Sequence, residues 1–250
     1  MMPVVTESVA WLDRQLSGWM GAGLPQAWWQ ATGVHLAIYL IGGGVGLWLT
    51  RWLWPALGWG REIDPQPPAP GQLRRELRHG LVACLVFGVV SLSYRHLCQG
   101  IWPASLFEAA WQLAAFVAFN NVYAYATHRL LHTRWMAGVH GVHHRSVRVT
   151  PLSGYSVHAL EAVIIAATLP LFMLLVPLGV GMAWVLHAVG MLYTTCLHCN
   201  YDLMPGLSDQ GRFKKLINHP TYHRYHHTLG NVNYGFTNRV MDLLFGTKRD

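Results

Sequence analysis

Residues 105–144 read SLFEAAWQLAAFVAFNNVYAYATHRLLHTRWMAGVHGVHH. The stretch opens as an apolar run through residue 127 and then passes directly into histidine-rich sequence. An apolar run of roughly 20 residues is the length that an α-helix needs to cross a bilayer. The stretch therefore predicts a transmembrane helix that carries histidines just beyond one membrane surface.

The rest of the chain has the composition of an integral membrane protein. Of its 250 residues 52% are hydrophobic and only 12% are charged, whereas soluble domains carry about a quarter charged residues. The 12 Trp and 10 Tyr are residues that collect at membrane–water interfaces. Further crossings are predicted at about residues 28–54 and 81–102, with two more between 158 and 195. We therefore predict an all-α fold, a polytopic helical bundle of about four to five transmembrane helices with a histidine-rich cap.

The basic residues indicate how this bundle is oriented. Five crossings place the connector 60–79, residues 128–157 and residues 198–250 on one face, which then holds 15 of the 18 Lys and Arg. The positive-inside bias assigns that face, and the histidines on it, to the cytoplasm. The basic residues lie between apolar runs rather than in one stripe, so the net charge of +7 does not indicate a nucleic-acid partner.

Three histidine motifs point to metal chemistry. Residues 128–132 form H-x-x-x-H, and residues 140–144 and 223–227 each form H-x-x-H-H. On a helix, residues three and four apart are neighbours, so each motif should gather its imidazoles on one face. One H-x-x-x-H alone is compatible with ordinary surface polarity, but neutral imidazole is a common metal ligand. Because eight imidazoles exceed the four or so that one tetrahedral ion uses, two ions are predicted.

Other histidines are weaker candidates. His198 and His158 lie at the predicted ends of crossings, at a depth where they could complete a metal shell or simply hydrogen-bond at the interface. His219 lies four residues before His223 but precedes Pro220, which interrupts a continuous helix. The remaining histidines fit no cluster and are assigned no function: His35, His79, His96 and His187.

The order of these motifs resembles the fatty acid hydroxylase / sterol desaturase superfamily. The resemblance covers about residues 105–250 and rests on HGVHHRS at 140–146, YSVHALEA at 155–162, TYHRYHH at 221–227 and NYGFTNRVMDLLFGT at 233–247. It implies a catalytic domain at residues 81–250. Residues 1–80 carry no motif of this superfamily. Apolar residues recur there at helical spacing, which predicts an N-terminal amphipathic helix that lies on the membrane or packs on the bundle: Val5, Val9, Leu12, Leu16 and Trp19. The first transmembrane helix and a proline-rich connector follow it.

The resemblance also implies a non-haem centre of two iron ions that uses O2 to hydroxylate or desaturate an unactivated C–H position of a membrane lipid. No catalytic residue beyond the metal centre is implied. The common pattern of the superfamily has a small residue at the position of His219, so the role of this histidine stays open. The implied metal ligands are His128, His132, His140, His143, His144, His198, His223, His226, His227 and, as an added candidate, His158.

The choice of metal and two other functions, a zinc hydrolase and a metal transporter or sensor, can be weighed by their chemistry. Oxidising an aliphatic C–H bond with O2 needs a redox-active metal, although the ligand set alone would also accept zinc or copper. A zinc-dependent lipid hydrolase would want a carboxylate base beside its ligands, and no H-E-x-x-H is present. A metal transporter or sensor would place ionisable residues along a path through the membrane.

The sequence contains no haem, dinucleotide or iron–sulfur motif. Electrons must then come from an external reductase, ferredoxin or cytochrome, and the basic face suits an acidic donor. The substrate stays open among sterol, fatty acyl and related lipids.

Overall fold

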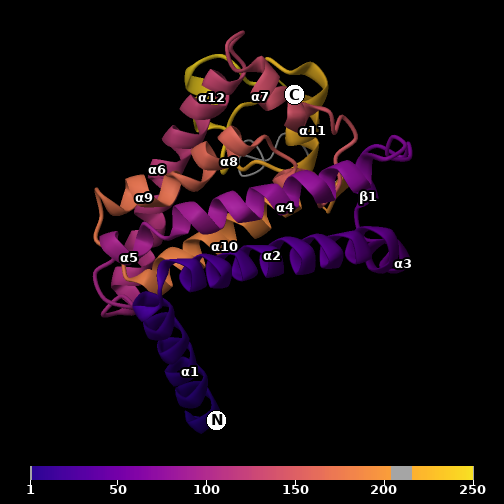
Figure 1. Cartoon of the computed structure of the whole chain (residues 1–250). Coiled ribbons are helices and arrows are strands. Elements are labelled where there is room, and N and C mark those ends of the chain that lie inside the picture. The colour runs from indigo at the N-terminus through magenta and orange to yellow at the C-terminus, as the bar shows by residue number, and fades with distance from the viewer. Residues whose placement is uncertain (1, 204–215, 250) are drawn as a thin grey trace.

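The computed structural model describes residues 2–203 and 216–249, and their regular secondary structure is helical apart from two short strands (Figure 1). The predicted all-α fold is therefore confirmed. The elements are α1 (Met2–Gly21), α2 (Leu24–Trp48), a π-helical turn (Leu49–Leu53), α3 (Trp54–Leu57), β1 (Arg61–Glu62), α4 (Gln72–Ser91), α5 (Tyr94–Leu97), α6 (Leu106–Leu131), α7 (Ala137–His144), a 3-10 turn (Ser153–Tyr155), α8 (Ala159–Ala166), α9 (Thr168–Met173), α10 (Val180–Leu197), β2 (Tyr201–Asp202), α11 (Pro220–Leu229) and α12 (Val240–Leu244).

Three helical segments of the described chain are long and apolar enough to cross a membrane: Leu24–Leu57, Gln72–Leu97 and Val180–Leu197. The chain is accordingly an integral membrane protein. Helix α6 has 26 residues, but polar side chains such as Gln112, Asn120 and Asn121 lower its mean hydropathy, and it is not among these three segments. Within the described residues, the structure therefore has three of the four to five predicted crossings. Residues 159–173, where a fourth crossing was expected, form the short helices α8 and α9. At 1.5 Å per residue these 15 residues span about 22 Å, less than the roughly 30 Å of a bilayer core.

Small residues bring the first two membrane helices together. A methyl group built onto Gly80 of α4 would collide with the ring of Tyr39 in α2, and one on Gly88 would collide with Thr32. Tyr39 and Thr32 are fully buried at these two crossing points. Glycines at such contacts allow close backbone approach in membrane bundles. Figure 1 shows α2, α4 and α10 lying side by side as a layer, with α6, α7, α11 and α12 gathered on one side of it.

Glu76 of α4 anchors the loop that follows α7. Its fully buried carboxylate accepts hydrogen bonds from the hydroxyls of Ser146 (2.7 Å), Thr150 (2.6 Å) and Ser153 (2.8 Å). The side-chain amide of Gln72 donates a fourth, at 2.7 Å. A buried carboxylate is tolerated when its oxygens are satisfied in this way. The network fixes residues 146–153 against the membrane layer, and with them the end of the histidine-bearing helix α7.

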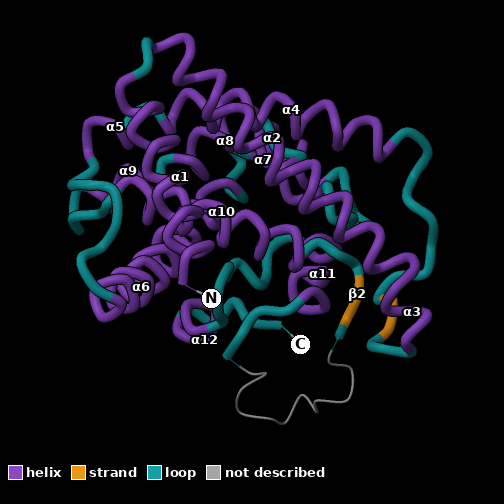
Figure 2. Tube along the Cα trace, turned by 90° about the horizontal axis from the view of Figure 1, so that it is seen from below, coloured by secondary structure: helices purple, strands orange, loops and turns teal. Residues whose placement is uncertain are grey.

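The connector, the loop after α7 and the segment after α10 meet at one end of this layer. Strand β1 pairs antiparallel with β2, and Figure 2 shows both strands beside α3 and α11. Arg148 contacts Glu62 at 2.7 Å, and Arg224 of α11 contacts Asp64 at 2.5 Å. These contacts join the described parts of the three segments predicted to share a face. Three basic residues counted for that face lie outside the described residues: Arg212, Lys214 and Lys215. Its cytoplasmic assignment stays a prediction.

Helix α1 combines the two arrangements expected for it. Its last turn packs on the bundle through the buried Trp19, whose indole N–H donates to the carbonyl of Ala27 at 2.8 Å. The preceding turns extend away from the bundle (Figure 1). The apolar side chains of Val9 and Leu12 there are 45% and 40% exposed, as expected for a helix that contacts lipid.

Candidate metal centre

Three helices and one helix end supply the histidines. Ser105 caps the start of α6 by accepting from the backbone N–H of Glu108 at 3.1 Å, and the helix ends in the first motif. Helices α7 and α11 carry the two H-x-x-H-H motifs. Pro220 occupies the first turn of α11, where its missing N–H costs no hydrogen bond. His198 is the C-cap of α10.

The structure brings nine of the ten predicted ligands into two groups. Within each group one ligand nitrogen per ring lies within 4.8 Å of all the others. We call the first group cluster A; it consists of His128, His132, His140, His144 and His226. We call the second cluster B; it consists of His143, His198, His223 and His227. The two clusters adjoin, because the rings of His144 and His227 have centroids 4.9 Å apart.

Each H-x-x-H-H motif divides its ligands between the clusters. In α7, His140 and His144 belong to cluster A, and His143 points to cluster B. In α11 the roles are exchanged, so that the pair four residues apart serves cluster B and His226 serves cluster A. The expectation that all three histidines of a motif share one face was wrong. The i and i+4 rings act together, and the i+3 ring faces the neighbouring cluster.

The spacing of the nitrogens fits metal coordination. In cluster A, His144 Nε2 lies 3.1 Å from the Nε2 atoms of His140 and His226. In cluster B, His198 Nε2 lies 2.9 Å from that of His223 and 3.3 Å from that of His227. Ligand bonds of about 2.1 Å bring neighbouring nitrogens about 3.0 Å apart at right angles and about 3.4 Å apart in a tetrahedron. Both clusters therefore match the donor spacing that one ion each requires.

Hydrogen bonds from Nδ1, the nitrogen that faces away from the cluster, orient three of the rings through backbone carbonyls and a fourth through a carboxylate. The Nδ1–H groups donate to backbone carbonyls: His128 to Tyr234 (2.9 Å), His226 to Val232 (2.7 Å) and His198 to Thr194 (2.7 Å). Such bonds fix the tautomer and leave the Nε2 lone pair facing the metal position.

His140 differs from these three, because its Nδ1–H donates to the carboxylate of Glu161 at 2.7 Å. Both residues are buried. A carboxylate behind a ligand imidazole raises the basicity of that ligand and holds its ring in place.

Burial keeps the cluster histidines in their metal-binding form. Desolvation lowers the pKa of His132 to about 3 and that of His144 to about 4. It also holds the pKa values of His143 and His226 well below the ordinary value. Neighbouring histidines lower these pKa values further by charge repulsion. The rings are therefore neutral at physiological pH, and neutral imidazole is the form that binds metal.

The predicted ligand His158, and His219, whose role the sequence left open, lie outside both clusters. His158 is exposed and caps α8 by accepting from the backbone N–H of Leu160 at 3.1 Å. The structure does not bring it to the centre, because the start of α8 uses its ring as a cap. His219 caps α11 in the same way, and its Nε2 lies 2.5 Å from Arg239.

The ligand motifs did not indicate two supporting acidic residues. Glu161, one turn into α8, orients His140. Asp242 of α12 is fully buried and accepts from the backbone N–H groups of Tyr234 and Gly235 at 2.9 and 2.7 Å. It thereby holds the carbonyl of Tyr234 in position for His128. Asp242 lies within segment 233–247, which carries part of the resemblance. The sequence therefore marked this segment as a family motif but did not show what Asp242 does.

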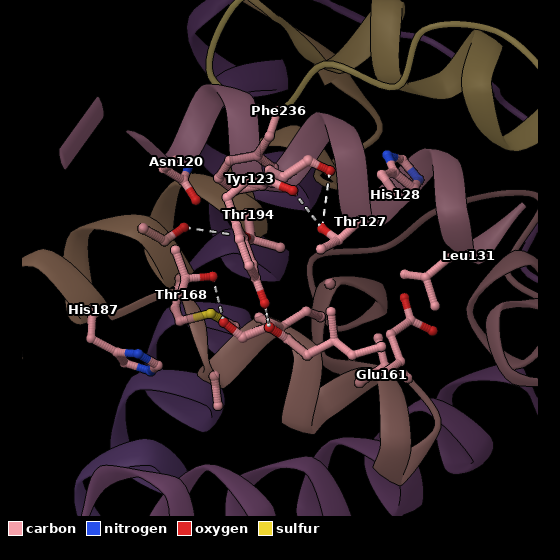
Figure 3. A pocket seen from close by; sticks show the side chains of 18 of the residues that line it. Asn120, Tyr123, Thr127, His128, Leu131, Glu161, Thr168, His187, Thr194 and Phe236 are labelled. Atoms are coloured by element: carbon pink, nitrogen blue, oxygen red, sulfur yellow. Dashed lines mark hydrogen bonds between the residues drawn. The ribbon is translucent and has the colours of Figure 1, made fainter. Parts of the chain in front are cut away.

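A cavity of about 160 Å3 extends from the clusters between α6, α8, α9 and α10 (Figure 3). Imidazoles of both clusters line one end, and most of the remaining wall is apolar, including Leu131, Ile165 and Leu186. The cavity is larger than one water molecule needs, which is roughly 10–15 Å3. It can therefore admit an apolar group to the histidine clusters.

The model of the family described as "Fatty acid hydroxylase" matches residues 113–247 of this chain. The chain belongs to the fatty acid hydroxylase family. The match covers all nine histidines of clusters A and B together with Glu161 and Asp242.

Individual relatives of this family member are distant. Methylsterol monooxygenase 2-2 of Arabidopsis thaliana is 27% identical over 146 residues, covering 57% of this chain and 54% of the relative. Human lathosterol oxidase is 23% identical over 187 residues, covering 70% and 61%. Very-long-chain aldehyde decarbonylase GL1-6 of Oryza sativa subsp. indica is 30% identical over 131 residues, covering 49% and 20%. The chain thus spans between 20% and 61% of the length of these relatives. No solved structure gives a significant match.

Proposed function

We propose that this fatty acid hydroxylase family member is a membrane oxygenase that hydroxylates or desaturates an unactivated C–H position of a lipid. The observation that carries the proposal is the pair of adjoining imidazole clusters at one end of an apolar cavity. The names of two relatives, a methylsterol monooxygenase and a lathosterol oxidase, support oxidative chemistry on a lipid.

Two iron ions are the proposed occupants, one held by cluster A and one by cluster B. Iron supplies the redox chemistry that O2 activation needs, which zinc does not have. In hydroxylation the lipid C–H and O2 give C–OH and water, with two electrons and two protons taken up. In desaturation two hydrogens leave the lipid and O2 becomes two waters, again with two added electrons and two protons.

The protein contributes positioning and exclusion of water. Cavity residues such as Ile165 and Leu186 hold the apolar part of the lipid, and those at the other end, such as Leu131, lie beside the histidines. Glu161 and the three backbone carbonyls hold the ligand rings in fixed orientations. Because these rings are already held in place, little free energy is spent on reorienting them when the substrate binds.

We further propose that the clusters face the cytoplasm and take electrons from an external reductase, ferredoxin or cytochrome. The positive-inside bias of the three segments that meet at one end supports the orientation. The same basic residues would attract an acidic donor.

The test is elemental analysis of the purified full chain, followed by O2 consumption with a reductant and a lipid extract. We expect about two irons per chain and O2 uptake that requires both lipid and reductant. A protein that contains only zinc, or that releases a fatty acid by ester hydrolysis without using O2, would overturn the proposal.

A further inference from the structure

One face of α10 runs along the cavity from cluster B to the middle of the membrane helix. The residues of α10 and its C-cap that line the cavity include His187, Gly190, Met191, Thr194 and His198. Their spacing of three, four, seven and eleven residues places them on one helical face. Eleven residues at 1.5 Å each separate His187 from His198 by about 16 Å along the axis. The cavity therefore has two polar ends, and Figure 3 shows His187 and His128 on opposite sides of it.

The inner end holds a second, smaller histidine group. His187 is only 8% exposed, and its ring contacts that of the fully buried His35 of α2, with centroids 4.5 Å apart. His35 Nε2 lies 2.9 Å from the hydroxyl of Ser91. His35 Nδ1 and His187 Nε2 have no hydrogen-bond partner within the described chain. A buried polar atom left without a hydrogen bond destabilises the folded protein.

Aromatic side chains surround this pair of histidines. The rings of Phe87 and Trp184 lie 5.5 and 5.2 Å from that of His35, so the neighbours are aromatic. Within the described residues, the pair is not part of any group of three or more metal-ligating side chains. Both histidines lie in the middle of helices that are apolar enough to cross a membrane. Ionisable residues at such depth usually serve function rather than stability.

We propose that His187, backed by His35, binds a hydroxyl or carbonyl group of the lipid at the inner end of the cavity. A neutral imidazole can donate to a carbonyl or accept from a hydroxyl, so it suits both groups. The inference rests on the proposed function, which places the oxidised carbon at the clusters. The substrate is then a lipid with a polar group about three helical turns from the carbon that reacts. A chain with a plain methyl end would leave the His187 nitrogen unpaired.

The inference is tested by binding, without turnover. The purified, metal-loaded full chain is mixed in detergent with equal amounts of an alcohol and its parent hydrocarbon, and bound lipid is measured by native mass spectrometry. The probe pairs are hexadecan-1-ol with hexadecane and cholestanol with cholestane. One buried hydrogen bond should favour the alcohol roughly fivefold to tenfold in at least one pair.

The variants separate recognition from shape. His187→Phe keeps a flat ring but removes both nitrogens, so the alcohol preference should fall to about one; His187→Leu serves if that variant does not purify. His187→Gln should retain part of the preference, because its amide can also donate or accept. A Cβ built at Gly190 meets nothing within 4 Å, so Gly190→Leu should fill the cavity and weaken binding of alcohol and hydrocarbon alike. His96→Phe, which alters an exposed histidine, is the matched control, and an unchanged metal content shows that each variant is folded.

Three results would overturn the inference: no binding of either pair, equal binding of alcohol and hydrocarbon by the unaltered protein, or an undiminished preference in the variant that replaces His187, whether with Phe or with Leu. A failure of the proposed function would look different. It would abolish lipid-dependent O2 uptake and leave the alcohol preference and its dependence on His187 intact.

Discussion

Replacing Glu161 should weaken metal binding at cluster A without removing a ligand. Its carboxylate accepts the Nδ1–H of His140 at 2.7 Å, whereas the three other oriented rings donate to neutral carbonyls. Burial raises the pKa of Glu161 to about 8, and a metal ion bound to His140 would favour the ionised carboxylate. A hydrogen bond to a charged group contributes about 1.5–3 kcal/mol. Loss of the acceptor in Glu161→Leu should therefore weaken metal binding at cluster A by roughly 10-fold to 150-fold. Glu161→Gln keeps an acceptor oxygen and should cost about tenfold or less.

The measurement is titration of the metal-free protein with ferrous iron under anaerobic conditions, with affinities obtained from a competing chelator. Two binding steps are expected, and Glu161→Leu should shift only one of them. His158→Gln is the matched control, because His158 caps the same helix but lies outside both clusters. If Glu161→Leu bound both ions as tightly as the unaltered protein, the orienting role of the carboxylate would be refuted.

Four further outcomes follow from the same contacts. His226→Ala should lower iron at cluster A and His143→Ala at cluster B, each abolishing lipid oxidation while membrane insertion stays intact; full activity in either variant, measured by product analysis, would contradict the assignment. Gly80→Ala should destabilise the protein by about 1–3 kcal/mol in denaturant unfolding, since the added methyl group meets the ring of Tyr39. Glu76→Ala should lower the free energy of unfolding by about 3 kcal/mol or more, because it removes the acceptor of four buried hydrogen bonds; a loss under 1 kcal/mol would show that the network is not needed. Burial lowers the pKa of two cluster A histidines to about 3 and 4, so the folded metal-free protein binds fewer protons than the unfolded chain below about pH 6.5. The denaturant concentration at the midpoint of unfolding should therefore fall as the pH drops from 6.5 to 4. A midpoint that does not change with pH would count against buried neutral rings.

The predictions that came true depend on local geometry. H-x-x-x-H brings His128 and His132 into one cluster because residues four apart always share a helical face. The apolar runs in α2, α4 and α10 indicated membrane helices by length and composition, and the structure has three such segments. These features need no knowledge of the tertiary fold.

The predictions that failed depend on which surface a helix turns toward its neighbours. His143 belongs to cluster B while His140 and His144 belong to cluster A, because α7 supplies rings to both clusters. The spacing of histidines in the sequence does not show how α7 is rotated about its axis relative to the other helices. His158 had the right depth but is used as a helix cap, and the same dual use of polar residues at helix ends makes single histidines weak predictors.

The inner histidines show a different limit of sequence reasoning. His35 and His187 are 152 residues apart and fit no cluster in the sequence, so neither was assigned a function. Only the contact between α2 and α10 brings their rings together beside the cavity.

Anomalous scattering at the iron absorption edge, from crystals of the iron-loaded full chain, tests the central claim most directly. Our interpretation predicts two separate peaks, one among the five rings of cluster A and one among the four of cluster B. A single peak, or iron bound away from these nine imidazoles, would contradict it.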